Sequence, residues 1–182
     1  MIKLYSDDDI KIVGDKPSRD VKKNRETDLS QSGPDKEIVK RAREWGKAVA
    51  LKFIEDVKNA GDNGEALDCE MLMQRCMLLS FTATVGFEQL SGDSVSGIAQ
   101  KSFLDVIRNT DAELHRTVSD TGAFSFYYLA FRRGGEVDRR IGQTFAMLCS
   151  HDGDPVYQEL GEALYCWFLS EVKQAANEFL FN

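Results

Sequence analysis

Four arginines fall within nine residues of this sequence, in the segment RRGGEVDRR at residues 132–140. They are Arg132, Arg133, Arg139 and Arg140. Guanidinium groups bind phosphates and carboxylates through paired hydrogen bonds, and backbone N–H groups ahead of a helix start favour the same anions. The cluster is therefore a candidate anion site. The alternative is a solvated turn in which Glu136 pairs with Arg140, since most charge clusters form solvated surfaces.

Arg75 is a second candidate for binding a ligand. It is the only charged residue between Met71 and Phe87, in an otherwise largely apolar stretch. Arginines are seldom buried without a partner. Two interpretations stay open: a narrow exposed stripe that Arg75 shares with Asp68 and Thr82, or a buried guanidinium that binds the acid group of a ligand or a partner protein.

Cys149 and His151 stand two positions apart and raise the question of a thiol nucleophile with its base. Catalytic pairs of this kind usually come from distant parts of a chain. Zinc would need further paired ligands, and His115 is the only other histidine. We therefore predict no catalytic residue, no metal and no cofactor. Cys149 should be a small buried residue, with His151 near a helix end.

The segment FSFYYLAF at residues 124–131 places five aromatic rings in eight positions. Exposed rings interleaved with cations would make a stacking platform for bases, but here the cations lie at one end only. Rings recur at helical spacing, at Phe124, Tyr127, Tyr128 and Phe131. Arg132 and Arg133 followed by Gly134 form a typical helix ending. We predict a helix here with its rings turned toward the core.

These candidate residues need elements to position them, and apolar side chains recur every three or four positions after residue 34. That period predicts helices at about residues 34–60, 65–90, 95–107, 110–118, 124–133, 136–149 and 155–180. The helix at 65–90 is apolar nearly all round, so other helices should enclose it. The sequence predicts an all-α, single-domain bundle of about seven helices at residues 34–182, with 65–90 and 155–180 central.

Some residues within these helices carry local signals. Thr110 and Glu113 have the spacing of a capping box, and Asp154 with Pro155 resembles an N-cap and a first helical residue. Segments 44–60 and 159–175 align without gaps and match at seven positions. Helix periodicity alone forces matches of this kind. If the two helices instead occupy related places, Gly46 and Gly161 would mark close helix contacts.

The first 33 residues differ from the rest of the chain. They contain seven basic and seven acidic residues, so the remainder carries the whole net charge of −7. Their polar, proline- and serine-containing composition predicts a flexible or extended N-terminal arm at 1–33. A small β-hairpin over IKLYSDDDIKIVG is the alternative, although two such strands alone are marginally stable.

Charge and hydropathy bound the function. A net charge of −7 repels nucleic-acid backbones and anionic membranes, so neither is an expected partner. No export signal or membrane-spanning stretch is visible, which predicts a cytoplasmic protein with free thiols. The leading expectation is a non-enzymatic protein–protein interaction or self-associating module. The alternative is a small-ligand or anion-binding protein, a class that includes enzymes. Its ligand would bind the four clustered arginines, with Arg75 as a further candidate. Nucleic-acid binding by that cluster ranks last.

Overall fold

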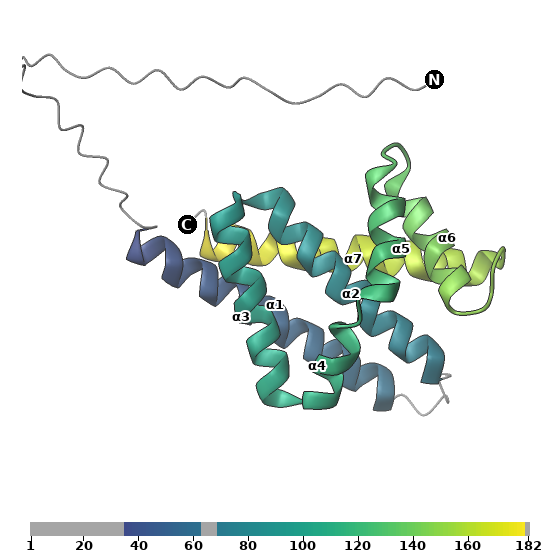
Figure 1. Cartoon of the computed structure of the whole chain (residues 1–182), viewed down its shortest axis with the longest axis horizontal. Helices are drawn as coiled ribbons and strands as arrows, with labels where there is room; N and C mark the ends of the chain where they lie inside the picture. The colour runs from purple at the N-terminus through teal and green to yellow at the C-terminus, as the bar shows by residue number, and fades with distance from the viewer. Residues whose placement is uncertain (1–34, 63–68, 181–182) are drawn as a thin grey trace, which may run out of the picture. The chain divides into compact units, whose positions relative to one another are not determined.

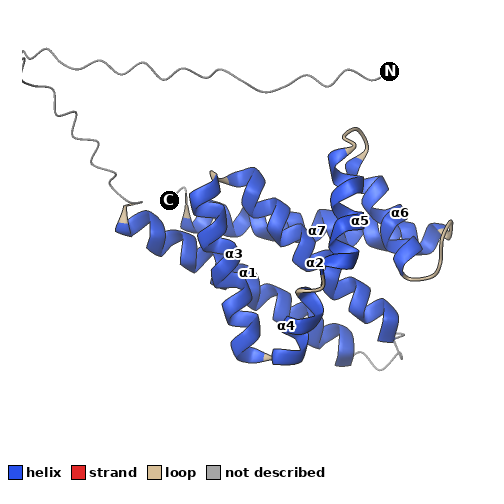
Figure 2. Ribbon diagram, in the orientation of Figure 1, coloured by secondary structure: helices blue, strands red, loops and turns tan. Residues whose placement is uncertain are grey.

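The computed structural model describes residues 35–62 and 69–180, which form seven α-helices and no strand (Figures 1 and 2). The helices are α1 (Lys36–Asp62), α2 (Cys69–Leu90), α3 (Asp93–Thr110), α4 (Ala112–Val118), α5 (Thr121–Arg132), α6 (Val137–Leu148) and α7 (Pro155–Phe179). The predicted all-α bundle is confirmed. The predicted N-terminal arm, its boundary with the bundle and the predicted helix start at residue 65 lie outside the described residues.

The central helix is α2, as its apolar sequence predicts. It contacts each of the other six helices of the described chain, and most of its residues from Gln74 to Phe87 are buried. The interpretation of an exposed polar stripe on this helix, one of the two left open, is wrong at Thr82. That side chain is fully buried, and its hydroxyl donates to the Leu78 carbonyl oxygen at 2.8 Å. A hydroxyl satisfied within its own helix can be buried at little cost.

The core joins α2 to α1, α3 and α7 through large side chains. Trp45 of α1 is fully buried and donates its indole N–H to the Val172 carbonyl oxygen of α7 at 3.1 Å. Its ring meets Phe87 of α2 edge-on, with centroids 4.7 Å apart. Phe103 of α3 packs against Phe87 in the same way at 6.0 Å. The buried indole therefore has both apolar contacts and a hydrogen-bond acceptor.

Gly46 and Gly161 both lie where helices approach closely, which the second interpretation of the internal alignment predicts for these two glycines. A Cβ atom at Gly46 would overlap the Ala99 carbonyl oxygen of α3, and one at Gly161 would overlap Phe145 of α6. Gly142 of α6 makes an equally close approach to the backbone of α7, which the sequence analysis missed. These contacts bring α1 against α3, and α6 against α7.

Aspartates cap four of the described helices, including α1, where the Asp35 carboxylate accepts the Glu37 backbone N–H at 3.1 Å. The carboxylate of Asp111 accepts two backbone N–H groups at the start of α4, both at 2.9 Å. Asp120 caps α5 at 2.7 Å, and Asp154 caps α7 at 2.8 Å as predicted. The predicted capping box at Thr110 is wrong, because Thr110 is the last residue of α3 and its hydroxyl donates to the Val106 carbonyl oxygen.

Three large apolar side chains that belong to the three-to-four period are exposed: Ile38, Val156 and Trp167. Ile38 and Val156 lie in the first turns of α1 and α7. Beside Trp167, Phe168 occupies the fully buried position. A three-to-four period marks a stripe on each helix, but the neighbouring helices decide how much of that stripe is covered. Among the described helices, none combines the length and the apolar character required to cross a membrane.

Candidate functional site

The aromatic segment is a helix, α5, and one of its faces belongs to the core. Tyr127 is fully buried and stacks on Phe81 of α2, with ring centroids 5.5 Å apart. Phe124 and Phe131 meet the same Phe81 ring edge-on at 5.5 and 6.2 Å. Burial raises the pKa of Tyr127 well above its usual value, so this phenol stays protonated and serves as packing.

The other face of α5 is exposed, so the prediction that all its rings face inward is wrong. Phe126 retains 50% of its accessible surface and Leu129 retains 59%, and Tyr128 is also exposed. Large apolar side chains occupy most of the circumference of α5, but this helix contacts only α2 and α6 among the described helices. The uncovered side chains therefore point to solvent.

A tight turn joins α5 to α6. Arg133 ends α5, and Gly134 and Gly135 follow with φ values of +65° and +72°. Residues with a side chain seldom adopt this left-handed region, so the two glycines allow the chain to reverse. As a result α5 and α6 pack side by side as a hairpin (Figure 1).

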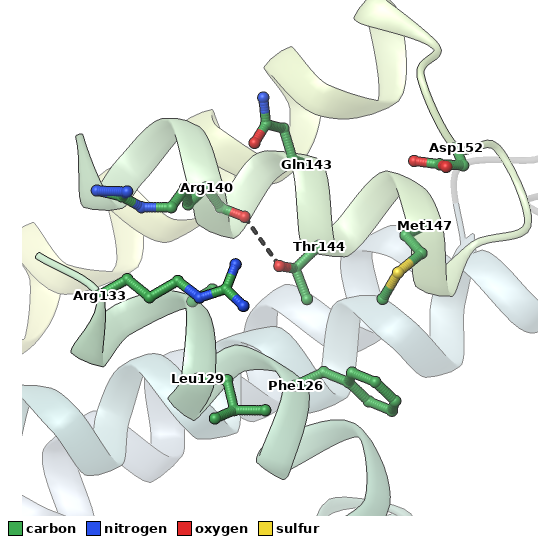
Figure 3. Close-up of a pocket in the computed structure, with 9 residues that line it drawn as sticks. Phe126, Leu129, Arg133, Arg140, Gln143, Thr144, Met147 and Asp152 are labelled. Carbon is green, nitrogen blue, oxygen red and sulfur yellow. Dashed lines mark hydrogen bonds between the residues drawn. The ribbon is translucent and has the colours of Figure 1, made fainter. Parts of the chain in front are cut away.

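A groove of about 380 Å³ runs between these two helices (Figure 3). This α5–α6 groove is lined by Phe126, Leu129, Ala130 and Arg133 from the α5 side, Arg140, Gln143, Thr144 and Met147 from α6, and Asp152 from the following loop. Figure 3 shows both arginines at one end of the groove, with Phe126, Met147 and Asp152 at the other. The groove thus has a cationic end and an apolar end.

Of the four clustered arginines, Arg133 and Arg140 line the groove, with their guanidinium groups pointing in different directions (Figure 3). Neither guanidinium has an ion pair or hydrogen bond within the described residues, and the Nε atom of Arg140 is buried without an acceptor. Arg140 packs instead over the backbone of Gly135, where a Cβ atom would lie 2.7 Å from its Nη2. A buried N–H group without an acceptor costs about 1–3 kcal/mol, and more when it is charged.

The other two arginines of the cluster have partners outside the groove. Arg139 pairs with Glu136 at 3.2 Å, and the Arg132 guanidinium lies 5.8 Å from the centre of the Tyr128 ring. The predicted pair between Glu136 and Arg140 is therefore wrong. On a helix, Glu136 could pair with a residue three or four positions later. Arg140 turns toward the α5–α6 turn, so Glu136 pairs with Arg139.

Arg75 is held by a carboxylate of the same chain. Its Nε and Nη2 atoms donate to the two Oδ atoms of Asp56 in α1, at 2.8 and 2.6 Å. The two side chains are only 22% and 12% exposed. Neither open interpretation describes this pair, since Arg75 is neither part of an exposed stripe nor free for a ligand. Asp56 was not predicted as the partner of Arg75. Helix α1 carries several charged residues, and the sequence does not show which of them faces Arg75 on α2.

Cys149 is buried as predicted, and His151 follows the end of α6. The Nδ1 atom of His151 lies 2.7 Å from the Cys149 carbonyl oxygen, and its ring stacks on Tyr157 with centroids 3.8 Å apart. Burial, reinforced by the Asp56 carboxylate, raises the pKa of another thiol, Cys76, to about 11. In the part of the chain that the structure describes, no three His, Cys, Asp or Glu side chains are grouped so that they could hold a metal ion.

The arginines at the cationic end of the groove were predicted from the sequence as candidate site residues, whereas the apolar end was not predicted. Phe126, Leu129 and Arg133 follow one another at helical spacing, so one row of the groove was visible in the sequence. The row on α6, formed by Arg140, Thr144 and Met147, was not assigned to the same surface. Its position depends on how closely α6 packs against α5, which no local pattern specifies.

No protein-family model matches this chain, and comparison with curated proteins and with solved structures found no significant similarity. The basis for a functional proposal is therefore the geometry and chemistry of the α5–α6 groove.

Proposed function

We propose that this protein is a non-enzymatic protein-binding module and that the α5–α6 groove is its docking surface. One observation carries the proposal: Phe126, Leu129 and Met147 are large apolar side chains, each at least 41% exposed, and all three line the same groove. Single exposed apolar residues are ordinary on protein surfaces. A contiguous group of them with polar groups at its edge is typical of an interaction site.

The shape of the groove suits a helical partner. Two helices that pack side by side present rows of side chains, and a third helix can lay its apolar face between them. Complete burial of a Leu, Phe or Met side chain contributes about 1.5–3 kcal/mol. These three side chains are already partly covered, so docking would gain only part of that for each. The apolar end alone therefore supports weak binding, and charged contacts at the other end would have to add to it.

Site-specific photo-crosslinking in cells that express the full chain tests the proposal. A benzophenone-bearing amino acid would replace Leu129 in the groove or, as a matched control, Leu51 of α1, which is 62% exposed. We expect a discrete adduct from position 129 that is absent from position 51. Adding Phe126→Ser and Met147→Ser should abolish it, because the apolar contacts are lost.

The crosslinked product also identifies the kind of partner. An adduct of twice the chain mass, together with a dimer in light scattering, would show self-association through the groove. A different mass would show another protein. The same adducts at positions 129 and 51, or none at either, would overturn the proposal.

A small-anion site in the same groove is the second candidate, because Arg133 and the buried Arg140 Nε lack acceptors within the described residues. A crystal soaked in sulfate or phosphate should then show an ordered anion in contact with both guanidinium groups. An empty site, with the arginines splayed apart, would contradict it. A cytoplasmic site of action stays a prediction from the sequence.

A further inference from the structure

Both rows of side chains along the α5–α6 groove change from apolar to cationic toward the same end of the groove. On the α5 side the order is Phe126, Leu129, Arg133; on α6 it is Arg140, Thr144, Met147. Because the two helices run antiparallel across a short turn, both arginines fall at the turn and both apolar ends fall together (Figure 3). The first and last residues of each row are seven positions apart, which corresponds to about 10.5 Å, or two helical turns.

The two arginines at the cationic end have no carboxylate partner among the described residues, unlike Arg75, which is paired with Asp56, and Arg139, which is paired with Glu136. Arg43, Arg116 and Arg132 are also without one, so what distinguishes Arg133 and Arg140 is that both line the same groove. The Arg133 guanidinium points toward Thr144, whereas the Arg140 guanidinium points away from it and lies over Gly135 (Figure 3). Each guanidinium could therefore bind its own carboxylate from a docked segment. Hydrogen bonds between two ionised groups are stronger than those between neutral ones.

The apolar end carries the opposite charge. Asp152 borders the groove beside Met147, on the side away from the arginines (Figure 3). A carboxylate of a docked segment would be repelled there and attracted at the turn, two helical turns away. The charges of the groove therefore favour one orientation of a docked segment over its reverse.

We infer that the groove selects an amphipathic helix by charge polarity: apolar side chains cover Phe126, Leu129 and Met147, and acidic side chains lie over Arg133 and Arg140. This inference rests on the proposed docking function. A nucleic-acid strand is a poorer fit, because its phosphates continue along its whole length and would meet Asp152. The partner is thus a protein segment with its carboxylates at one end of a two-turn apolar stripe.

Peptide display against the immobilised full chain tests this inference without a known partner. The library would hold random helical peptides of about four turns, long enough to overlap the two-turn rows of the groove. We expect enriched peptides with two apolar residues three or four apart, and Asp or Glu one further turn along. The double variant R133E/R140E should instead enrich Lys or Arg at that position. A second double variant, R43E/R116E, makes the same charge change at exposed sites on α1 and α4 and should leave the acidic preference intact.

A synthetic peptide with the selected sequence then gives an affinity. We expect the Kd to rise about tenfold or more in R133E/R140E, which corresponds to a loss of about 1.4 kcal/mol. R133E alone should show a smaller rise in the same direction. This single variant matters because Arg133 is exposed, so its replacement keeps the test valid even if loss of the half-buried Arg140 disturbs the fold.

The outcomes separate the inference from the proposed function. Enriched peptides that are apolar but show no acidic preference, or that keep this preference against R133E/R140E, would overturn the charge inference and leave the docking function standing. If no enriched peptide binds in the groove, the result would count against both the charge inference and the docking function.

Discussion

At the level of single residues, the carboxylate beside an arginine decides what that arginine does. Arg75 and Asp56 bind each other through two short hydrogen bonds in a mostly covered place, whereas Arg41 and Glu37 form an exposed pair at 3.4 Å within α1. Solvent screens the exposed pair, so its contribution to stability is small. In the covered pair, loss of one partner leaves the other with unsatisfied donors or acceptors.

A double-mutant cycle with Asp56→Ala and Arg75→Ala should therefore give a coupling free energy of about 1.5–3 kcal/mol. The matched cycle with Glu37→Ala and Arg41→Ala should give about 0.3–0.5 kcal/mol. Urea denaturation of all variants would measure both. Equal coupling in the two pairs would show that the coverage of the Asp56–Arg75 pair has no energetic effect.

The thiol of Cys76 predicts a fall in stability at high pH. Burial raises its pKa to about 11 in the folded protein, above its usual value of about 8.5–9. A raised folded-state pKa stabilises the protein fully below the unfolded pKa, and this stabilisation is lost as the pH rises toward 11. By pH 10.5 the loss should reach about 2 kcal/mol.

Urea denaturation between pH 8 and 10.5 tests this expectation. Cys76→Ala should flatten the fall in unfolding free energy, even if the smaller side chain lowers stability at pH 8. Cys69→Ala, at an exposed thiol, should leave the pH dependence unchanged. The same steep fall in both variants would assign the effect to other groups, such as Tyr127, whose pKa is also raised by burial.

At the level of the helices, close packing depends on positions without a side chain. Gly46 brings α1 against the backbone of α3, and Gly142 brings α6 against the backbone of α7. Backbone atoms cannot turn away from an added methyl group as a flexible side chain can. A larger residue at either position must therefore push the helices apart.

Gly46→Ala should consequently lower the free energy of unfolding by about 1–3 kcal/mol, the usual cost of overpacking. Gly97→Ala makes the same change on the exposed surface of α3, where no atom lies within 4 Å of the new Cβ. Since alanine favours helix over glycine, this variant should be more stable by about 0.5–1 kcal/mol. Thermal and urea denaturation would reveal the opposite signs. Two changes of the same sign would contradict the assigned helix contact.

At the level of the whole bundle, α2 is the helix that joins the other described helices into one core. It contacts all six of them, and Phe81 at its centre touches the buried rings of α5. A core shared in this way should unfold as one cooperative unit, with no stable subset of helices.

Phe81→Ala should therefore destabilise the bundle by about 3–5 kcal/mol. Leu51→Ala, at an exposed site on α1, should change stability by less than about 0.5 kcal/mol. Far-ultraviolet circular dichroism follows the helices. Tryptophan fluorescence in a Trp167→Phe background, which leaves Trp45 in the core as the reporter, should give a coincident transition. Separate transitions would show that part of the bundle folds independently.

Much of the fold could be predicted because helix formation follows local rules. The period of apolar side chains identified the helices, and Asp154 with Pro155 marked the start of α7. Two of the errors arose where two neighbouring residues could play the same part. Thr110 and Asp111 are both good N-caps, and Arg139 and Arg140 both lie within reach of Glu136. In each case the position of the next helix made the choice.

The sequence by itself determined which segments are helical and which side of each is apolar, because both depend on residues within a few positions of one another. Only the tertiary structure decided which apolar stripes are covered and which arginines meet a carboxylate. Arg75 finds Asp56 19 positions away, and Trp45 finds Val172 127 positions away. Phe126 and Arg140 remain uncovered and unpaired among the described residues for the same physical reason: contact and burial depend on how the helices pack, and no local period specifies that packing.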